Sequence, residues 1–269
     1  MLNVIRSESI KLRSTKAIWW TSALIVLFSL AWALLMGLAS SSGIKSAQES
    51  NDPELYASLV AGVNNDGALA GYLFFGLMVV MIQGVMLVTS EYGTNTSKTT
   101  LLATPTRWQV PLAKYVVYGV IASVLSLISA VGSILMFRWS LSWGLDDEEL
   151  LSRVSFSGDA WTVIGLIVLY TVLTVGVAIG VGYLVRHTAG AIATLLLWNL
   201  VIEGALVPML PKVRDWLPPY MPFNNATHAV RLNDVADAPW GHTGSMVYFA
   251  AWALVIFLAG LIVLKKRDA

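Results

Sequence analysis

Residues 160–185 read AWTVIGLIVLYTVLTVGVAIGVGYLV, and these 26 consecutive positions carry no charged side chain. A helix needs about 20 residues to cross the ~30 Å hydrocarbon layer of a membrane, so this stretch is long enough to span it. Five more apolar runs of similar length occupy residues 17–39, 68–90, 115–137, 189–208 and 245–264. The sequence therefore predicts six transmembrane helices.

The composition of the chain points to the same class of protein. Hydrophobic residues make up 57% of the 269 positions and charged residues only 12%, about half the charge of a typical soluble domain. Spanning segments must be helices or closed barrels, and barrel strands give short alternating patterns rather than continuous apolar runs. We predict an all-α polytopic membrane protein with a single six-span domain over residues 17–264.

The distribution of Lys and Arg predicts the orientation of the chain. If both termini share one side with the 91–114 and 185–189 loops, that side holds 11 basic and 3 acidic residues and has a net charge of +8. The other side holds 6 basic and 13 acidic residues, a net charge of −7. Because loops rich in Lys and Arg stay in the cytoplasm, we expect both termini to be cytoplasmic in the cell membrane, with residues 265–269 as a basic tail.

Residues 1–16 are too polar to cross a membrane. Leu2, Ile5 and Leu12 fall on one helical stripe, and Glu8 lies three residues before Lys11. This pattern predicts a short helix at the membrane interface. A basic tail that only fixes the topology is the alternative interpretation.

The segment 208–243 is apolar but rich in proline. It holds six of the nine prolines, which break helices, so it is too broken to span and too apolar for free solvent. We predict a re-entrant external segment after the fifth span, packed against protein or lining a wet cavity. The two earlier external segments, 40–66 and 140–159, are predicted as solvated loops, the first with a short helix near 53–60.

The chain lacks the residue patterns of common catalytic and cofactor sites. It has no G-x-x-x-x-G-K-[ST] phosphate loop, no H-E-x-x-H and no G-x-S-x-G. Its histidines, His187, His228 and His242, have no metal-ligand spacing, and it has no cysteine. We therefore expect no catalysis, metal or cofactor in this polypeptide and no nucleic-acid partner.

Two features within the spans carry hypotheses. Glu203 is an ionisable residue in the fifth span, where a carboxylate is costly and often marks a pathway or a partnered site. Three interpretations of Glu203 are open. It lines a pathway, it holds the 208–243 segment by a hydrogen bond or ion pair, or it is solvated at the interface. Gly176 and Gly180 form a small-xxx-small pair that permits close helix packing, within the subunit or between subunits.

The loop 91–114 between the second and third spans is the best clue to function. Gly93 permits a turn after Glu91, a short helix is predicted over residues 97–104, and Pro105 ends it. Leu101 and Leu102 have nothing of their own to pack against on so short a helix. They indicate a docking site for a soluble partner, with adhesion to the membrane surface as the alternative.

Several of these motifs, in this order, resemble those of the type-2 ABC exporter permeases. They are Arg6-Ser7-Glu8-x-x-Lys11-Leu12-Arg13-Ser14, Glu91-Tyr92-Gly93-Thr94, Thr99-Thr100-Leu101-Leu102-Ala103-Thr104-Pro105, and Lys114 at the head of the third span. The six-span layout resembles that family too, in particular the short permeases of high-G+C Gram-positive bacteria. The chain departs from the family after Tyr92, where a basic residue is often found, which leaves the partner of Glu91 open.

The resemblance implies the membrane half of an ATP-driven exporter. Two permease subunits, identical or related, would pair in the lipid membrane, and two cytoplasmic ABC ATPases that bind ATP and Mg would dock on them. The 97–104 helix would be the main coupling helix and the Arg186–Gly190 turn a second contact. The residues expected to carry this coupling are Glu91, Lys98, Leu101, Leu102, Pro105, Arg107 and Arg186.

The scarcity of charge in the spans favours an amphiphilic cargo such as a drug, peptide or lipid over ions. The alternative function is a non-transporting membrane sensor or scaffold regulated by an ABC-type ATPase. A membrane-embedded enzyme is disfavoured because no His, Asp and Glu set converges. The identity of the cargo is not encoded in any motif of the sequence.

Overall fold

The computed structural model describes residues 1–94, 96, 106–145 and 147–267, apart from the side chain of Arg267. The regular elements among these residues are all helices, with no strand. Six helices are long and apolar enough to cross a membrane: Lys16–Glu49, Asn65–Gly93, Gln109–Ser142, Ala160–Val185, Thr188–Met209 and His242–Lys266. Each contains one of the six apolar runs, so the prediction of an all-α polytopic protein is confirmed.

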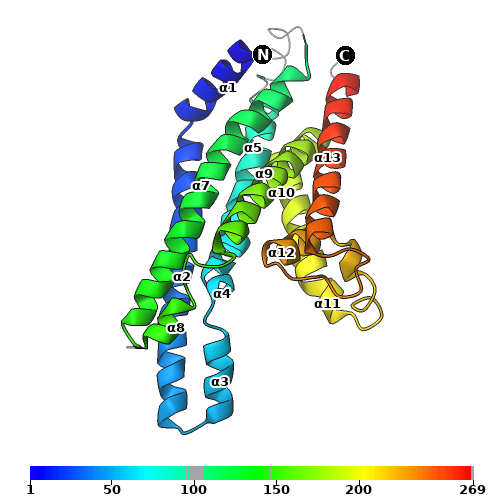
Figure 1. Cartoon of the computed structure of the whole chain (residues 1–269). Coiled ribbons are helices and arrows are strands. Elements are labelled where there is room, and N and C mark those ends of the chain that lie inside the picture. The colour runs from blue at the N-terminus through cyan, green and yellow to red at the C-terminus, as the bar shows by residue number, and fades with distance from the viewer. Residues whose placement is uncertain (95, 97–105, 146, 268–269) are drawn as a thin grey trace. The chain divides into compact units, whose positions relative to one another are not determined.

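The helices follow one another along the chain as labelled in Figure 1. The first span is preceded by α1 (Leu2–Ser14) and formed by α2 (Lys16–Glu49). After α3 (Pro53–Ala61), the second span joins α4 (Asn65–Gly71), the π-helical η1 (Tyr72–Gly76) and α5 (Leu77–Gly93). The third and fourth spans are α7 (Gln109–Ser142) and α9 (Ala160–Val185), with the short α8 (Glu148–Ser152) between them.

The proline-rich segment lies between the fifth and sixth spans in the sequence. The fifth span runs through α10 (Thr188–Leu196), the π-helical η2 (Leu197–Leu206) and α11 (Val207–Met209). Then come a 3₁₀ turn, η3 (Pro218–Tyr220), and α12 (Pro222–Val230), before the sixth span, α13 (His242–Arg267). Pro222 occupies the first position of α12, where its missing N–H costs no helical hydrogen bond.

The chain divides into two compact units. Unit 1 consists of residues Met1–Thr21, Met78–Ser123 and Val168–Ala269, and unit 2 consists of Ser22–Leu77 and Val124–Ile167. Each unit is built from helices distant in the sequence and has its own buried apolar side chains. Every site described below lies within unit 1.

Unit 2 contains a helical hairpin of α2 and α3 (Figure 1). The prediction of a solvated loop over 40–66 is wrong for its first part, because α2 continues to Glu49. Ile44 and Ala47 are almost fully buried there, and burial of their side chains favours continuing the helix beyond the apolar run. The short helix expected near 53–60 is present as α3, capped by the carboxylate of Asp52, which accepts a hydrogen bond from the backbone N–H of Leu55.

In unit 1, α9 and α13 approach each other closely at two glycines. A methyl group placed on Gly180 would lie 2.6 Å from the carbonyl oxygen of Ile256, and one on Gly260 would lie 2.8 Å from the carbonyl oxygen of Gly180. Gly176, one turn earlier, faces the ring of Tyr115 instead. Gly180 therefore packs within the subunit, at a crossing that only glycine allows.

Candidate functional site

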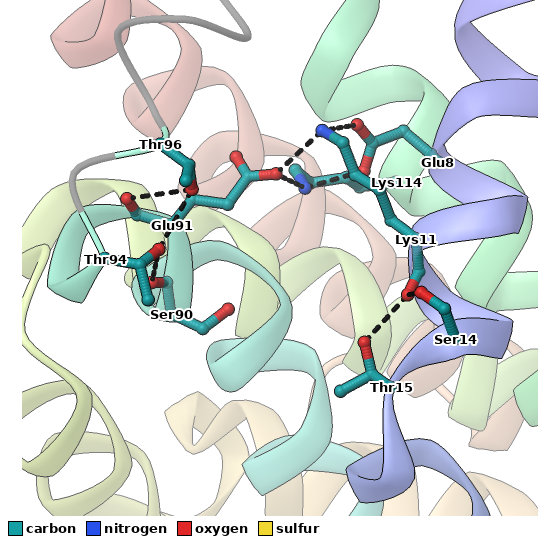
Figure 2. Close-up of polar contacts among 9 residues, drawn as sticks. All are labelled: Glu8, Lys11, Ser14, Thr15, Ser90, Glu91, Thr94, Thr96 and Lys114. Carbon is teal, nitrogen blue, oxygen red and sulfur yellow. Dashed lines mark hydrogen bonds and ion pairs between the residues drawn. The ribbon is translucent and has the colours of Figure 1, made fainter.

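Four charged side chains from three helices form a closed ring of ion pairs in unit 1 (Figure 2). The Nζ atom of Lys114 lies 2.7 Å from Oε2 of Glu8 and 2.7 Å from Oε1 of Glu91. The Nζ atom of Lys11 completes the ring, 2.8 Å from Oε1 of Glu8 and 3.1 Å from Oε1 of Glu91. We call these four residues the charge ring. It fastens α1 to the end of α5 and the beginning of α7.

The spacing of residues along α1 and α5 explains why the ring forms. Glu8, Lys11 and Leu12 follow the three- and four-residue spacing of one helix face, and Glu8 and Leu12 are buried. Glu91 lies in the last turn of α5, and Lys114 lies in the second turn of α7. The predicted stripe of Leu2, Ile5 and Leu12 is only partly correct. Leu12 is buried, but Leu2 is exposed, and Glu8 is buried instead.

Burial decides how strongly the ring holds the helices together. The side chains of Lys114 and Glu8 are 1% and 2% exposed, and that of Glu91 is 15% exposed. Two lysines and two glutamates make the ring neutral as a whole, so each buried charge has an opposite partner. Loss of one partner would leave an uncompensated charge, which costs about 3–5 kcal/mol in a buried pair.

Lys11 is the exposed corner of the ring, with 42% of its side chain accessible. Burial acts to lower the pKa of Lys11, but hydrogen bonds and charge interactions with Glu8 and Glu91 together raise it above the ordinary value of 10.5. Lys11 is therefore protonated at neutral pH, as the ring geometry requires.

A cavity of about 420 Å³ opens beside the charge ring. Its charged end is formed by the ring itself, and its apolar wall by Leu12, Ala17, Met86 and Leu87. Gln83 and Ser90, both on α5, and Thr94, just beyond its end, also line the cavity. The volume falls in the ~300–1,000 Å³ range of small-molecule sites.

The turn between the fourth and fifth spans contacts the end of α5. The guanidinium of Arg186 lies 5.0 Å from the ring centroid of Tyr92, the residue after Glu91, in a cation–π geometry. Arg186 has a positive φ of 59°, and the next residue, His187, caps α10 by accepting a hydrogen bond from the N–H of Gly190. The hydroxyl group of Thr188 on α10 donates a 2.9 Å hydrogen bond to the hydroxyl oxygen of Thr89 on α5, which adds a second contact.

Glu203 lies in the π-helical part of the fifth span and is buried. Its Oε2 accepts a 2.8 Å hydrogen bond from the backbone N–H of Asn224, and its Oε1 accepts one from the indole of Trp198. Asn224 is in the first turn of α12, so the carboxylate caps that helix from another element. This contact is of the kind expected if Glu203 holds the proline-rich segment.

Asn225 organises the rest of that segment. It is fully buried, and its side-chain amide donates to the carbonyl oxygens of Pro219 and Met221, both at 2.8 Å. Its Oδ1 accepts a 3.0 Å bond from the indole of Trp240. Because proline removes backbone donors, side-chain bonds such as these hold the carbonyl groups of the turn before α12, where Pro219 and Met221 are buried.

A family model described as an ABC-2 family transporter protein matches residues 39–262. The chain belongs to the ABC-2 family of transporter proteins. The resemblance to type-2 ABC permeases found in the motifs is thereby confirmed. No curated protein sequence matches the chain. Glu91 and Lys114 lie inside the matched range, whereas α1, with Glu8 and Lys11, precedes it.

Membership of the ABC-2 family establishes the general role of the chain. Permeases of this family are membrane transport subunits and are not themselves catalytic, and they usually work with ATPase subunits. With its six apolar helices, the chain is a multi-pass membrane protein. Among the described residues, no group of three or more His, Asp or Glu side chains is arranged to hold a metal ion.

The structure of this ABC-2 permease brings together only some of the residues expected to act in coupling. Lys98, Leu101, Leu102 and Pro105 lie outside the described residues, as does the whole predicted helix 97–104. Arg107 lies in the turn before α7. Glu91 joins the charge ring and Arg186 contacts its neighbour Tyr92. Sequence reasoning noted Lys114 at the head of the third span but did not predict its ion pairs with Glu8 and Glu91.

Proposed function

We propose that this chain is the membrane permease of an ATP-driven ABC exporter and that the charge ring links its connector 91–114 to the rest of the subunit. The observation that carries the proposal is the ring itself, in an ABC-2 family chain. Glu91 is the last charged residue before the predicted coupling helix, and Lys114 is the first after Arg107. Lys114 is therefore fixed to α1 by a buried ion pair with Glu8, and Glu91 is held by its ion pairs with Lys114 and with the partly exposed Lys11.

In this proposal, two cytoplasmic ABC ATPases dock on a pair of permease subunits, and each ATPase contacts the segment 97–104, for which the sequence predicts a coupling helix. Movement of that segment reaches the spans through α5 and α7, because a neutral buried ring resists separation of the helices that it joins. The Arg186 turn adds a second point of contact through Tyr92. ATP and Mg are bound by the ATPases, and α1 lies at the membrane interface.

Direction and cargo form the finer part of the proposal. The six spans are apolar, and Glu203 is hydrogen-bonded to protein groups, which supports an amphiphilic cargo over an ion. The charge asymmetry of the loops supports cytoplasmic termini in the cell membrane. A reporter fused after Ala269 should be active only in the cytoplasm and one inserted near Glu148 only outside; opposite results would reverse the orientation.

Transport in proteoliposomes tests the functional proposal. The chain, assembled with its cognate ABC ATPase, should move a fluorescent amphiphile across the bilayer only when ATP is hydrolysed. Glu91→Gln, which weakens the ring, should reduce this flux more than it reduces ATP binding by the ATPase. An assembled complex that hydrolyses ATP but moves no amphiphile would contradict export and favour the sensor or scaffold alternative.

A further inference from the structure

We propose that the cavity beside the charge ring binds the headgroup of a zwitterionic phospholipid, one that carries both a phosphate and an ammonium group. The site goes beyond the proposed export function and does not depend on it. Three observations carry it: the two signs of charge at one end of the cavity, the apolar wall along α5, and the length of that wall.

The charged end of the cavity favours a ligand with both signs of charge. Lys11 is exposed there, yet its Nζ lies 2.8 Å from a carboxylate oxygen of Glu8 and 3.1 Å from one of Glu91. A purely anionic headgroup that approached Lys11 would meet both carboxylates, and like charges at such distances repel strongly outside bulk water. A phosphate at Lys11 with an ammonium group at Glu91 satisfies the two signs together.

Glu91 offers the acceptor that an ammonium group needs. Both of its ion pairs are made by Oε1, and in Figure 2 its second carboxylate oxygen points away from the two lysines. Glu91 lines the cavity and is 15% exposed. A charge-assisted hydrogen bond to this second oxygen would add to the ring without displacing either lysine.

The wall of the cavity favours an amphiphile over a free zwitterion. Gln83, Met86 and Leu87 lie below Ser90 and Glu91 on one face of α5, in a span-forming helix. From Gln83 to Glu91 the helix rises by eight steps, about 12 Å at 1.5 Å per residue. A headgroup at the ring would thus place the upper part of an acyl chain against Met86, Leu87 and Leu12.

The test measures lipid binding to the purified full-length chain, without an ATPase. Three ligands are compared: dioctanoyl phosphatidylethanolamine, dioctanoyl phosphatidylglycerol with the same chains but a net negative charge, and phosphoethanolamine without chains. We expect phosphatidylethanolamine to bind at one saturable site about tenfold more tightly than phosphatidylglycerol, which lacks the ammonium donor for Glu91. It should also bind about tenfold more tightly than phosphoethanolamine, which lacks the acyl chains that contact the apolar wall.

A matched pair of variants locates the site. Leu87→Trp fills the cavity and should weaken phosphatidylethanolamine binding about tenfold or more, by excluding the ligand. Leu254→Trp adds the same side chain at an exposed position of α13 and should leave binding unchanged. Equal binding of the two phospholipids, binding of phosphoethanolamine as tight as that of the lipid, or full binding by Leu87→Trp would each overturn the proposal.

A second measurement needs no variant. Phosphatidylethanolamine with a photoreactive group near its glycerol should crosslink to wild-type peptides that contain residues 8–17 and 83–94. Excess unlabelled phosphatidylethanolamine should abolish these crosslinks. Crosslinks confined to exposed faces of other spans, such as α13, would overturn the assignment even if Leu87→Trp fails to fold.

Discussion

The Nζ atom of Lys114 lies 2.7 Å from a carboxylate oxygen of Glu8, although 106 residues separate the two in the sequence. Both side chains are almost fully buried. The pair joins α1 to α7, and Glu91 on α5 forms a second ion pair with Lys114. This contact fixes an N-terminal helix, in which Leu12 is the one buried apolar side chain among the described residues Leu2–Ser14, to two membrane-spanning helices.

Lys114→Met should lower the stability of the permease markedly. The substitution leaves Glu8 buried without its closest cation, which costs about 3–5 kcal/mol. Thermal unfolding of the purified chain, followed by tryptophan fluorescence, measures the effect. Lys16→Met, at an exposed position of α2, is the control and should change little.

Removing both charges of the pair tests whether the pair itself is responsible. Glu8→Gln combined with Lys114→Met should cost less than the sum of the two single losses, because the double variant removes both members of the buried pair and leaves Lys11 paired with Glu91. Strictly additive losses in the double variant would mean that the two side chains contribute independently of their contact.

The raised pKa of Lys11 predicts that the folded permease loses stability in alkaline solution. Its pKa is raised above 10.5 in the folded chain, so its contribution is fully present below that pH and is lost as pH rises through the higher folded value. Lys11→Arg keeps the charge, since arginine does not deprotonate in this range. Melting temperatures measured from pH 9 upward should therefore fall less in Lys11→Arg than in wild type, and parallel curves would refute the assignment.

The two substitutions of Glu203 should differ in their effect on stability. Glu203→Leu leaves the N–H of Asn224 without its acceptor and should cost about 1–3 kcal/mol, while Glu203→Gln keeps an acceptor oxygen. We expect a lower melting temperature in Glu203→Leu and a nearly normal one in Glu203→Gln. If Glu203→Gln instead folds normally but loses transport, the carboxylate lines the pathway. Wild-type stability and wild-type transport in both variants would indicate a solvated side chain.

Gly180→Ala should loosen the crossing of α9 and α13. The added methyl group would meet the backbone of Ile256 at 2.6 Å, and overpacking of this kind costs about 1–3 kcal/mol. Gly165→Ala on the same helix has open space around the new methyl group and is the matched control. Equal melting temperatures in the two variants would show that the helices separate without cost.

The six spans were predictable because each contains an apolar run long enough to cross a membrane, and no tertiary contact is needed to recognise it. The helix ends were not, because they depend on packing: Ile44 and Ala47 extend α2 to Glu49 by burial that the Ser-rich sequence does not reveal. The π-helical course of Leu197–Leu206 likewise leaves no mark in residue spacing.

The charge ring was only half visible in the sequence. Glu8, Lys11, Glu91 and Lys114 all belong to motifs that the sequence shows, but their meeting depends on the packing of α1 against α5 and α7, which no local pattern encodes. The missing basic residue after Tyr92 is explained by the fold, since Lys11 and Lys114 supply the cations for Glu91. The hydrogen bond between Glu203 and Asn224 corresponds to one of three alternatives for this residue. The sequence alone could not decide among them, because the pattern of apolar residues in a span does not show which groups a buried carboxylate contacts.

The central claim, that this permease works with an ABC ATPase docked on its 91–114 connector, is tested most directly by copurification. The wild-type chain and the Leu101→Asp, Leu102→Asp double variant are each purified with the cognate ATPase, and the ATPase-to-permease ratio is measured. Met209→Asp with Leu210→Asp, an adjacent exposed apolar pair after the fifth span, is the matched control. We predict that the ratio falls several-fold in the connector variant alone, because new charges desolvate badly in a docking pocket. A wild-type ratio in the connector variant would contradict the account.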